Sequence, residues 1–241
     1  MKMKSFIKEN LTFLKRPLKF IKSNYARQRI SSKTTEDIFT NIYKTRGFGG
    51  ESLSGPGSDL IQTRTIRQEL PKLFKELKIS SILDIPCGDF FWLKETNLDF
   101  LSYIGADIVD DIIFDNNKQY AKKNVSFIKL NILKDKLPKT DLIICRDLFV
   151  HFSFKDISAA INNIISTNSK YILNTSFASL KKNKDILTGE WRPLNLLLPP
   201  FLFPNPIQII NENCQEAGGK FSDKSLLLWE ISSLKPLNLK N

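Results

Sequence analysis

The 241-residue sequence predicts an α/β fold in which helices cover both faces of a mostly parallel sheet. Three observations lead to this prediction. Segments with helical character, most clearly residues 154–165, separate the apolar runs from one another. A further apolar run at residues 225–231 follows two glycines and reads as a final strand. The apolar runs are short and bounded by turn residues, as strands buried on both faces are, and they lie at residues 81–85, 103–108, 125–130, 142–145 and 171–174.

The composition excludes a disordered tail protein, a collagen-like chain and a small disulfide scaffold. With 41% apolar residues, the chain can bury the core of one large domain, with or without an arm. The three cysteines, Cys87, Cys145 and Cys214, include no CxxC pair. This pattern argues against a structural zinc site or a disulfide framework and fits a reducing compartment. We therefore expect no bound metal and a cytoplasmic location.

The net charge of +11 is concentrated at the N-terminus. Residues 1–34 hold ten Lys or Arg and one Glu, a net charge of +9, and the rest of the chain carries only +2. A nearly neutral body lacks the basic groove that nucleic acid requires, so no nucleic-acid partner is expected. The chain is accordingly divided into a basic amphipathic arm, residues 1–45, and a domain, residues 46–241.

Within the arm, Phe6–Ile7, Phe13–Leu14 and Phe20–Ile21 repeat every seven residues, with Lys and Arg between them. This is helical periodicity, interrupted at Pro17. Charges break the apolar stretch too often for a membrane span or a signal peptide. Two interpretations stay open: residues 1–34 anchor the protein peripherally on the anionic inner membrane face, or the helix packs on its own domain.

A glycine-rich loop opens the domain. Residues 47–57 hold five of the ten glycines, which predicts sharp bends or a close approach to another group. Ser58 is expected to cap the helix that follows. Pro71 is expected to kink or end that helix.

Polar residues stand at the ends of four of the predicted strands. In open α/β sheets, ligands bind at the carboxyl ends of the strands. These positions therefore form the candidate site, and they are Asp84, Asp107, Asn131 and the pair Arg146-Asp147, with His151 shortly afterwards.

The loop after the first strand lacks the dinucleotide pattern GxGxxG. Only Gly88 fits it, and Pro86 and Phe90 occupy the other glycine positions, so a pyrophosphate-containing nicotinamide or flavin cofactor is disfavoured. An adenosine ligand without phosphates stays open. Asp107 is placed to accept hydrogen bonds from two ribose hydroxyls. Asn131 would either bond an adenine edge or cap the end of its strand.

Three segments resemble the class I S-adenosylmethionine-dependent methyltransferases: Ser-Ile-Leu-Asp84-Ile-Pro-Cys-Gly88-Asp, Tyr-Ile-Gly-Ala-Asp107-Ile and Asp141-Leu-Ile-Ile-Cys-Arg-Asp147. The resemblance covers residues 58–231. It implies a three-layer Rossmann-like fold with a seven-stranded sheet whose last strand is antiparallel, and S-adenosyl-L-methionine as cofactor. The implied cofactor-binding residues are Asp84, Pro86, Cys87, Gly88, Asp107, Ile108, Asn131, Ile132, Arg146 and Arg67. If Arg146 does not contact the cofactor, the alternative is a structural salt bridge with Asp84 or Asp107.

Residues 49–58, 145–153 and 189–195 resemble a narrower bacterial branch that is associated with surface-polysaccharide biosynthesis. This resemblance implies O-methylation of a surface glycan, a glycan precursor or another small-molecule acceptor. Two rivals stay open. The first is a methyltransferase that acts on nucleic-acid bases. Such enzymes typically carry Asp/Asn-Pro-Pro-aromatic after the fourth strand, whereas this chain has Cys-Arg-Asp-Leu there. A catalytically silent membrane-docking protein would keep the fold without turnover.

His151, the only histidine, is the candidate general base for a hydroxyl acceptor. Asp147, four residues earlier, would orient its imidazole if both lie on one helical face. The alternative is a structural histidine that bonds a backbone carbonyl.

Residues 178–210 form a proline-rich insertion, with five prolines between 191 and 206. We interpret it as a cap over the acceptor site or as a partner surface, or else as core packing beneath a long loop. Trp191 and Arg192 are the candidate substrate-binding residues, because they can stack on a sugar and hydrogen-bond to it.

Overall fold

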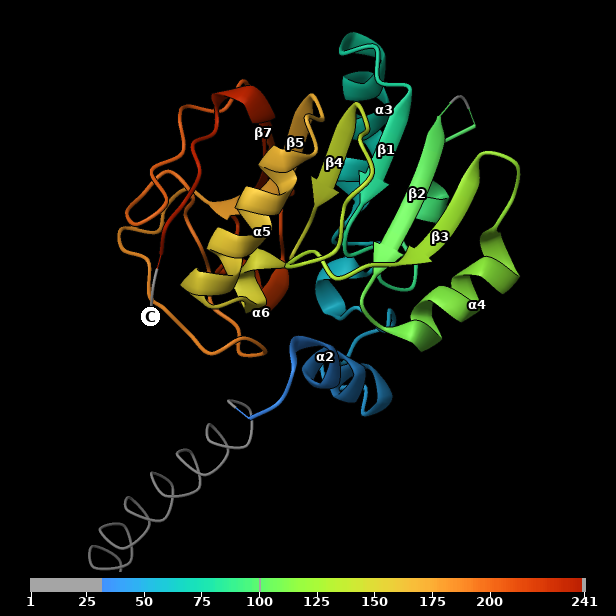
Figure 1. Cartoon of the computed structure of the whole chain (residues 1–241), viewed down its shortest axis with the longest axis horizontal. Coiled ribbons are helices and arrows are strands. Elements are labelled where there is room, and N and C mark those ends of the chain that lie inside the picture. The colour runs from blue at the N-terminus through green and yellow to red at the C-terminus, as the bar shows by residue number, and fades with distance from the viewer. Residues whose placement is uncertain (1–31, 100, 240–241) are drawn as a thin grey trace, which may run out of the picture.

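A computed structural model describes residues 32–99 and 101–239. Residues 1–31, which hold nearly all of the predicted membrane anchor, lie outside the described residues. Over the described part, seven strands form one sheet in the order β3-β2-β1-β4-β5-β7-β6 (Figure 1). Their bounds are β1 (Ser81–Asp84), β2 (Ser102–Asp107), β3 (Val125–Lys129), β4 (Leu142–Cys145), β5 (Tyr171–Phe177), β6 (Gln208–Asn211) and β7 (Lys224–Glu230).

The sheet confirms the predicted fold class. Strands β3, β2, β1, β4 and β5 pair in parallel. Strand β7 runs antiparallel to both of its neighbours, β5 and β6. Strand β6 was not predicted, and its first three residues belong to the segment that was assigned to the proline-rich insertion. Only Ile210 of this edge strand is buried, so its sequence carries little apolar signal.

Helices cover both faces of the sheet. Helix α5 (Phe154–Ser166) packs on one face, and α3 (Arg64–Glu76) and α4 (Asp110–Tyr120) pack on the other. Alternate strand residues supply the two cores: Leu83 and Ile143 face α5, whereas Ile82 and Ile144 face α3. This alternation follows from the period of two in a strand, and all four side chains are fully buried.

Helix α3 begins later than predicted. Residues Pro56–Ser58 form a 3₁₀ turn, and the helix starts at Arg64 after Thr63, so Ser58 is not its N-cap. The helix also continues through Pro71 instead of ending there. The apolar face on either side of this proline is buried, which keeps the helix on the sheet.

Helix α2 (Thr35–Lys44) lies across the edge at which the parallel strands end (Figure 1). A capping box starts it, because the Thr34 hydroxyl accepts from the Asp37 amide and the Asp37 carboxylate accepts from the Thr34 amide. Phe39 packs against the core on the α5 side of the sheet. Although residues 35–44 fall within the predicted arm, they contact the domain.

The proline-rich segment is largely part of the core. Leu194, Leu196, Phe201 and Phe203 are buried in the same cluster as α5. Its interior therefore corresponds to the core-packing interpretation, and only its beginning reaches the site described below.

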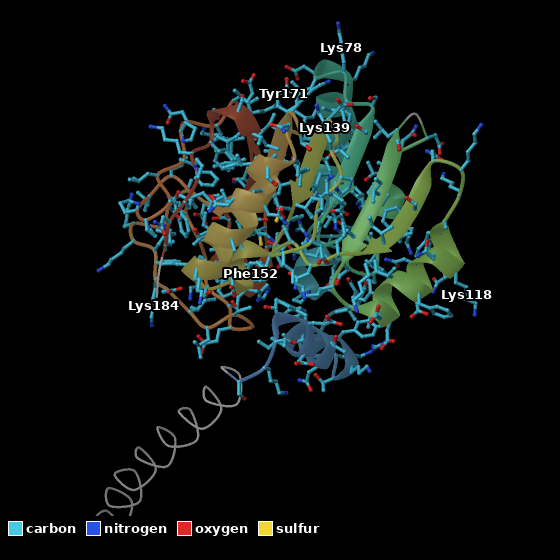
Figure 2. All side chains as sticks on the ribbon, viewed as in Figure 1. Lys78, Lys118, Lys139, Phe152, Tyr171 and Lys184 are labelled. Carbon is cyan, nitrogen blue, oxygen red and sulfur yellow. The ribbon has the colours of Figure 1, made fainter. Side chains whose placement is uncertain are left out.

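Lysine side chains extend from different sides of the domain, as Figure 2 shows for Lys78, Lys118, Lys139 and Lys184. The described residues contain no helix with both the length and the apolar character needed to span a membrane.

Candidate functional site

A cavity at the carboxyl-end edge of the sheet brings together most of the predicted site residues. The loops after β1 to β4, the glycine-rich loop and helix α2 all contribute to its wall. Arg67 does not line it: the Arg67 guanidinium donates to the Leu60 carbonyl, 3.0 Å away. The predicted residues that do line this first cavity are Asp84, Pro86, Cys87, Gly88, Asp107, Ile108, Asn131, Ile132, Arg146, Asp147 and His151.

Asp84 is a buried carboxyl at the end of β1. The Tyr103 hydroxyl donates to its Oδ2 at 2.7 Å. Burial raises the pKa of Asp84 to about 7, against the opposing effects of this hydrogen bond and of the Arg146 charge. Near neutrality Asp84 therefore holds a proton about half of the time, and a cation bound beside it would favour the ionised form.

Asp107 ends β2 and is held by backbone amides. The Val109 amide donates to its Oδ1 at 3.0 Å and the Gly88 amide to its Oδ2 at 3.2 Å. Burial raises the pKa of Asp107 to about 6 even though these bonds favour the carboxylate. Each carboxylate oxygen can accept more than one hydrogen bond, so both keep capacity for further donors.

In the loop after β1, Pro86 and Phe90 replace two glycines of the GxGxxG pattern, and neither side chain fills the cavity. Phe90 adopts a φ of 54°, in the left-handed region that glycine usually occupies. Its ring lies 5.1 Å from the rings of Tyr103 and Phe127, between centroids, and is buried among them. The side chain therefore points into the core on the α3 side. Pro86 contributes to the cavity wall.

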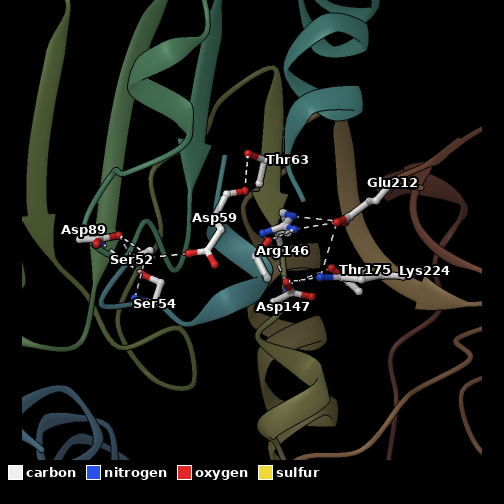
Figure 3. Close-up of polar contacts among 11 residues, drawn as sticks. Ser52, Ser54, Asp59, Thr63, Asp89, Arg146, Asp147, Thr175, Glu212 and Lys224 are labelled. Atoms are coloured by element: carbon white, nitrogen blue, oxygen red, sulfur yellow. Dashed lines mark hydrogen bonds and ion pairs between the residues drawn. The ribbon is translucent and has the colours of Figure 1, made fainter. Parts of the chain in front are cut away.

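The glycine-rich loop is fastened over this turn by Asp89 (Figure 3). The carboxylate of Asp89 accepts from the Ser52 hydroxyl and the Leu53 amide, both at 2.7 Å, and from the Ser54 hydroxyl at 3.2 Å. A Cβ on Gly88 would overlap the Ser54 side chain, so this approach requires glycine at position 88.

Asn131 follows β3 and stabilises its own turn. Its Oδ1 accepts from the Leu133 amide at 2.9 Å, which is the strand-end cap that was one of the two predicted alternatives. The side chain also lines the first cavity, beside the apolar residues Ile108 and Ile132.

A buried ion network joins Arg146 to residues from the other half of the sheet (Figure 3). Arg146 bonds both carboxylate oxygens of Glu212, at 2.6 and 3.2 Å, and donates to the Gly57 carbonyl at 2.7 Å. The predicted salt bridge of Arg146 with Asp84 or Asp107 is wrong. Lys224 Nζ lies 2.6 Å from the carboxylate of Asp147.

The network fixes the ionisation of its members. Burial alone would raise the pKa of Asp147, but the cations of Lys224 and Arg146 hold it well below its usual range. The Asp147 amide also donates to the Thr175 hydroxyl at 2.9 Å, which secures the backbone at this left-handed residue, whose φ is 56°. Asp147 is therefore a fixed anion.

The sequence analysis missed Glu212 and Lys224. Glu212 directly follows the unrecognised strand β6, so no strand end indicated it. Lys224 is the first residue of the buried strand β7. Because lysine is rarely buried without a partner, a lysine at the start of this apolar run could have indicated a buried ion pair.

A second cavity, of about 460 Å³, adjoins the first. Asp147 and His151 line both cavities. The second is walled by Trp191, Phe177 and Phe221. Its remaining ionisable residues are Cys214, Glu216, which is the first residue of helix α6 (Glu216–Gly219), and Lys224. Its volume lies within the range of small-molecule sites. In the part of the chain that the structure describes, no cluster of His, Cys, Asp and Glu could hold a metal ion.

The imidazole of His151 is oriented by a backbone carbonyl. Its Nδ1 lies 3.0 Å from the Glu190 oxygen, and the ring packs 4.8 Å from the Phe48 ring, between centroids. The Asp147 carboxylate accepts a hydrogen bond from Lys224 and forms none with the imidazole. The ring is therefore oriented by the Glu190 carbonyl and not, as predicted, by Asp147. Burial lowers the pKa of His151. In a neutral ring that donates from Nδ1, Nε2 carries a lone pair and can accept a proton.

The two predicted substrate-binding residues have different environments. Trp191 is 45% exposed, lines the second cavity and meets the Phe221 ring edge-on, with 5.1 Å between centroids. Arg192 is buried, and its guanidinium donates to the carbonyls of Phe149, Phe152 and Lys184. Arg192 therefore anchors the proline-rich segment and does not reach the cavity.

The described fold is the Rossmann-like fold of class I methyltransferases. No protein-family model and no curated protein matches the sequence. Among solved structures, the N-methyltransferase NodS from Bradyrhizobium japonicum WM9 with bound S-adenosyl-L-homocysteine is similar, with a TM-score of 0.58 and 14% identity over 79% of this chain and 98% of that chain.

Human N-acetylserotonin methyltransferase, in complex with S-adenosylmethionine, has a TM-score of 0.52 and 14% identity over 81% of this chain. The match spans 59% of the human chain, less than two thirds of its length. At 14% identity, these likenesses establish the fold.

Asp84→Asn is expected to change how stability depends on pH. An unfolded Asp ionises near 3.8, whereas folded Asp84 keeps its proton up to about pH 7. Between these values the folded state binds more protons, so the contribution of Asp84 to stability falls as the pH rises to 7 and is constant above it. The free energy of unfolding of Asp84→Asn relative to the wild type should therefore rise by on the order of 3 kcal/mol between pH 4 and 7.

Urea unfolding at a series of pH values measures this difference. Asp99→Asn, which changes an exposed carboxylate, serves as the control and should give a much smaller change over the same pH range. A flat difference for Asp84→Asn would contradict the elevated pKa.

Proposed function

We propose that this protein is an S-adenosylmethionine-dependent methyltransferase. The observation that carries the proposal is the first cavity, which joins a tight turn after β1, a buried acid at the end of β2 and apolar walls in a methyltransferase fold. When bound, the cofactor supplies an electrophilic methyl group.

The residues present fit this cofactor. Asp107 has acceptor capacity for two vicinal hydroxyls, and Ile108 and Ile132 form apolar wall for a flat base. Arg146 is the one Lys or Arg among the described residues that line the cavity, and Glu212 already pairs with it. A phosphate group would therefore find no available cation, whereas a ligand that carries positive charge meets the buried acids Asp84 and Asp107.

We further propose that the acceptor is a hydroxyl of a surface glycan or glycan precursor, bound in the second cavity. The half-exposed ring of Trp191 offers a stacking face for a sugar. His151 lies in the wall between the two cavities, with Nε2 able to take the hydroxyl proton. Asp147 and Lys224 supply fixed charges that can align the other sugar hydroxyls.

Asp107→Ala is expected to weaken S-adenosylmethionine binding by about tenfold to a hundredfold, since two charge-assisted hydrogen bonds are lost. Calorimetry with the full chain measures the affinity. Asp99→Ala, an exposed carboxylate, is the control and should bind like the wild type. Unchanged affinity in Asp107→Ala would refute the ribose assignment. Absence of binding by the folded wild type would refute the proposed cofactor.

His151→Ala is expected to lower turnover by about 10²- to 10⁴-fold, the usual contribution of a general base. The pKa of His151 is lowered, so the wild-type rate should rise with pH only below about 6.5 and stay level at neutral pH. The assay follows a labelled methyl group into O-methyl sugars released from bacterial surface-glycan fractions. Near-normal turnover of the variant would remove His151 as the base.

For the arm, we propose peripheral association with an anionic membrane. Its support is the net charge of +9 on residues 1–34. Replacing Lys15, Arg16, Lys19 and Lys22 by Gln in the full chain should abolish co-sedimentation with anionic vesicles, since each basic residue near such a surface contributes about 1 kcal/mol. Vesicles of neutral lipid are the control. Equal sedimentation of variant and wild type would contradict the anchor.

A further inference from the structure

One carboxylate in the second cavity, that of Glu216, has no direct ion pair in the described structure, although the charges of Lys224 and Arg146 act on it. Arg146 and Lys224 are balanced by Glu212 and Asp147, through contacts of 2.6 Å in each pair. Glu216 stands beside this network, and its buried Oε1 has no hydrogen-bond partner in the described structure. The other ionisable groups of the wall are His151, whose pKa burial lowers, and the Cys214 thiol, whose pKa burial raises, so both are neutral at pH 7. With Glu216 ionised, the charged lining residues Asp147, Glu216 and Lys224 sum to −1.

The position of Glu216 is constrained by the glycine-rich loop. A Cβ on Gly57 would lie 3.0 Å from Glu216 Oε1 and 3.2 Å from both Asp147 Oδ2 and Lys224 Nζ. One oxygen of Glu216 is thus enclosed against Gly57 with no donor. Burial raises the pKa of this carboxyl, against the opposing charges of Lys224 and Arg146, and a cation placed beside it would favour the ionised form.

Aromatic side chains line the same cavity. Trp191 and Phe221 meet edge-on, and Phe177 packs against both, with centroid distances of 5.1 to 6.4 Å. Such a wall offers faces for the C–H side of a sugar ring, while a carboxylate beside it favours a ring substituent that is positively charged. A linear polyamine would use the charge but not the stacking faces.

We propose that the second cavity binds an amino sugar whose ammonium group is received by Glu216. This inference rests on the proposed function for the cavity's role as acceptor site. It adds the substrate class: a glycan residue that carries a free amine in addition to the hydroxyl that is methylated.

The test uses three methyl glycosides that differ at one ring substituent: methyl glucosaminide, methyl N-acetylglucosaminide and methyl glucoside. Binding to the full chain is followed by tryptophan fluorescence at about pH 6.5, where the amine is protonated. The glucosaminide should bind about tenfold or more tightly than the other two, since it alone forms a charge-assisted contact. Glu216→Gln should abolish this preference.

Two variants control the experiment. Glu230→Gln makes the same change at an exposed residue at the other end of β7 and should keep the preference. Trp191→Ala should weaken all three glycosides alike, measured by calorimetry because the fluorophore is lost. Equal affinities, no binding of any glycoside, or a preference that survives Glu216→Gln would overturn the inference. A protein that shows the amine preference but does not bind S-adenosylmethionine would instead overturn the proposed function.

Discussion

The arrangement of the site depends on the ion pair between Arg146 and Glu212. The two side chains are 4% and 1% exposed, so neither charge can be satisfied by water. Arg146 follows β4, Glu212 follows β6, and the same guanidinium holds the Gly57 carbonyl. Removing either partner from a pair this buried typically costs about 3–5 kcal/mol, because the other charge is left uncompensated. The pair therefore fixes two strand ends and the glycine-rich loop relative to one another.

The acids that line the two cavities differ in what sets their pKa values. Asp84 and Asp107 are buried with hydrogen-bond donors, and burial dominates, so their pKa values rise to about 7 and about 6. The side chain of Asp147 is 27% exposed, and the neighbouring cations keep it ionised. The first cavity thus has acids whose ionised form a positively charged ligand would favour, whereas the boundary between the cavities is permanently charged. This division suits the proposed cationic methyl donor beside a proposed acceptor that must be held in one orientation.

The sequence predicted the strands that leave a recognisable apolar pattern, including the edge strand β3, in which the buried residues Val125 and Phe127 alternate with exposed ones. Strands such as β4, buried along its whole length, leave an apolar run, and the topology of a parallel sheet then places their polar ends together. Strand β6 was missed because it is a half-exposed edge, and Glu212 was missed with it. Arg192 was misassigned because a guanidinium that bonds a sugar and one that bonds carbonyls have the same sequence appearance. The Glu190 carbonyl that orients His151 comes from a backbone 39 residues away, which no side-chain pattern encodes.

The glycine-rich loop belongs to both cavities. Leu53 and Ser58 line the first, Gly55 and Gly57 line the second, and Ser54 lines both. The loop is held by Asp89 at one end and by Arg146 at the other. Because one segment forms part of both walls, a displacement at either of these two contacts would change the shape of both compartments together. The proposed donor site and the proposed acceptor site are thereby coupled through a single stretch of backbone.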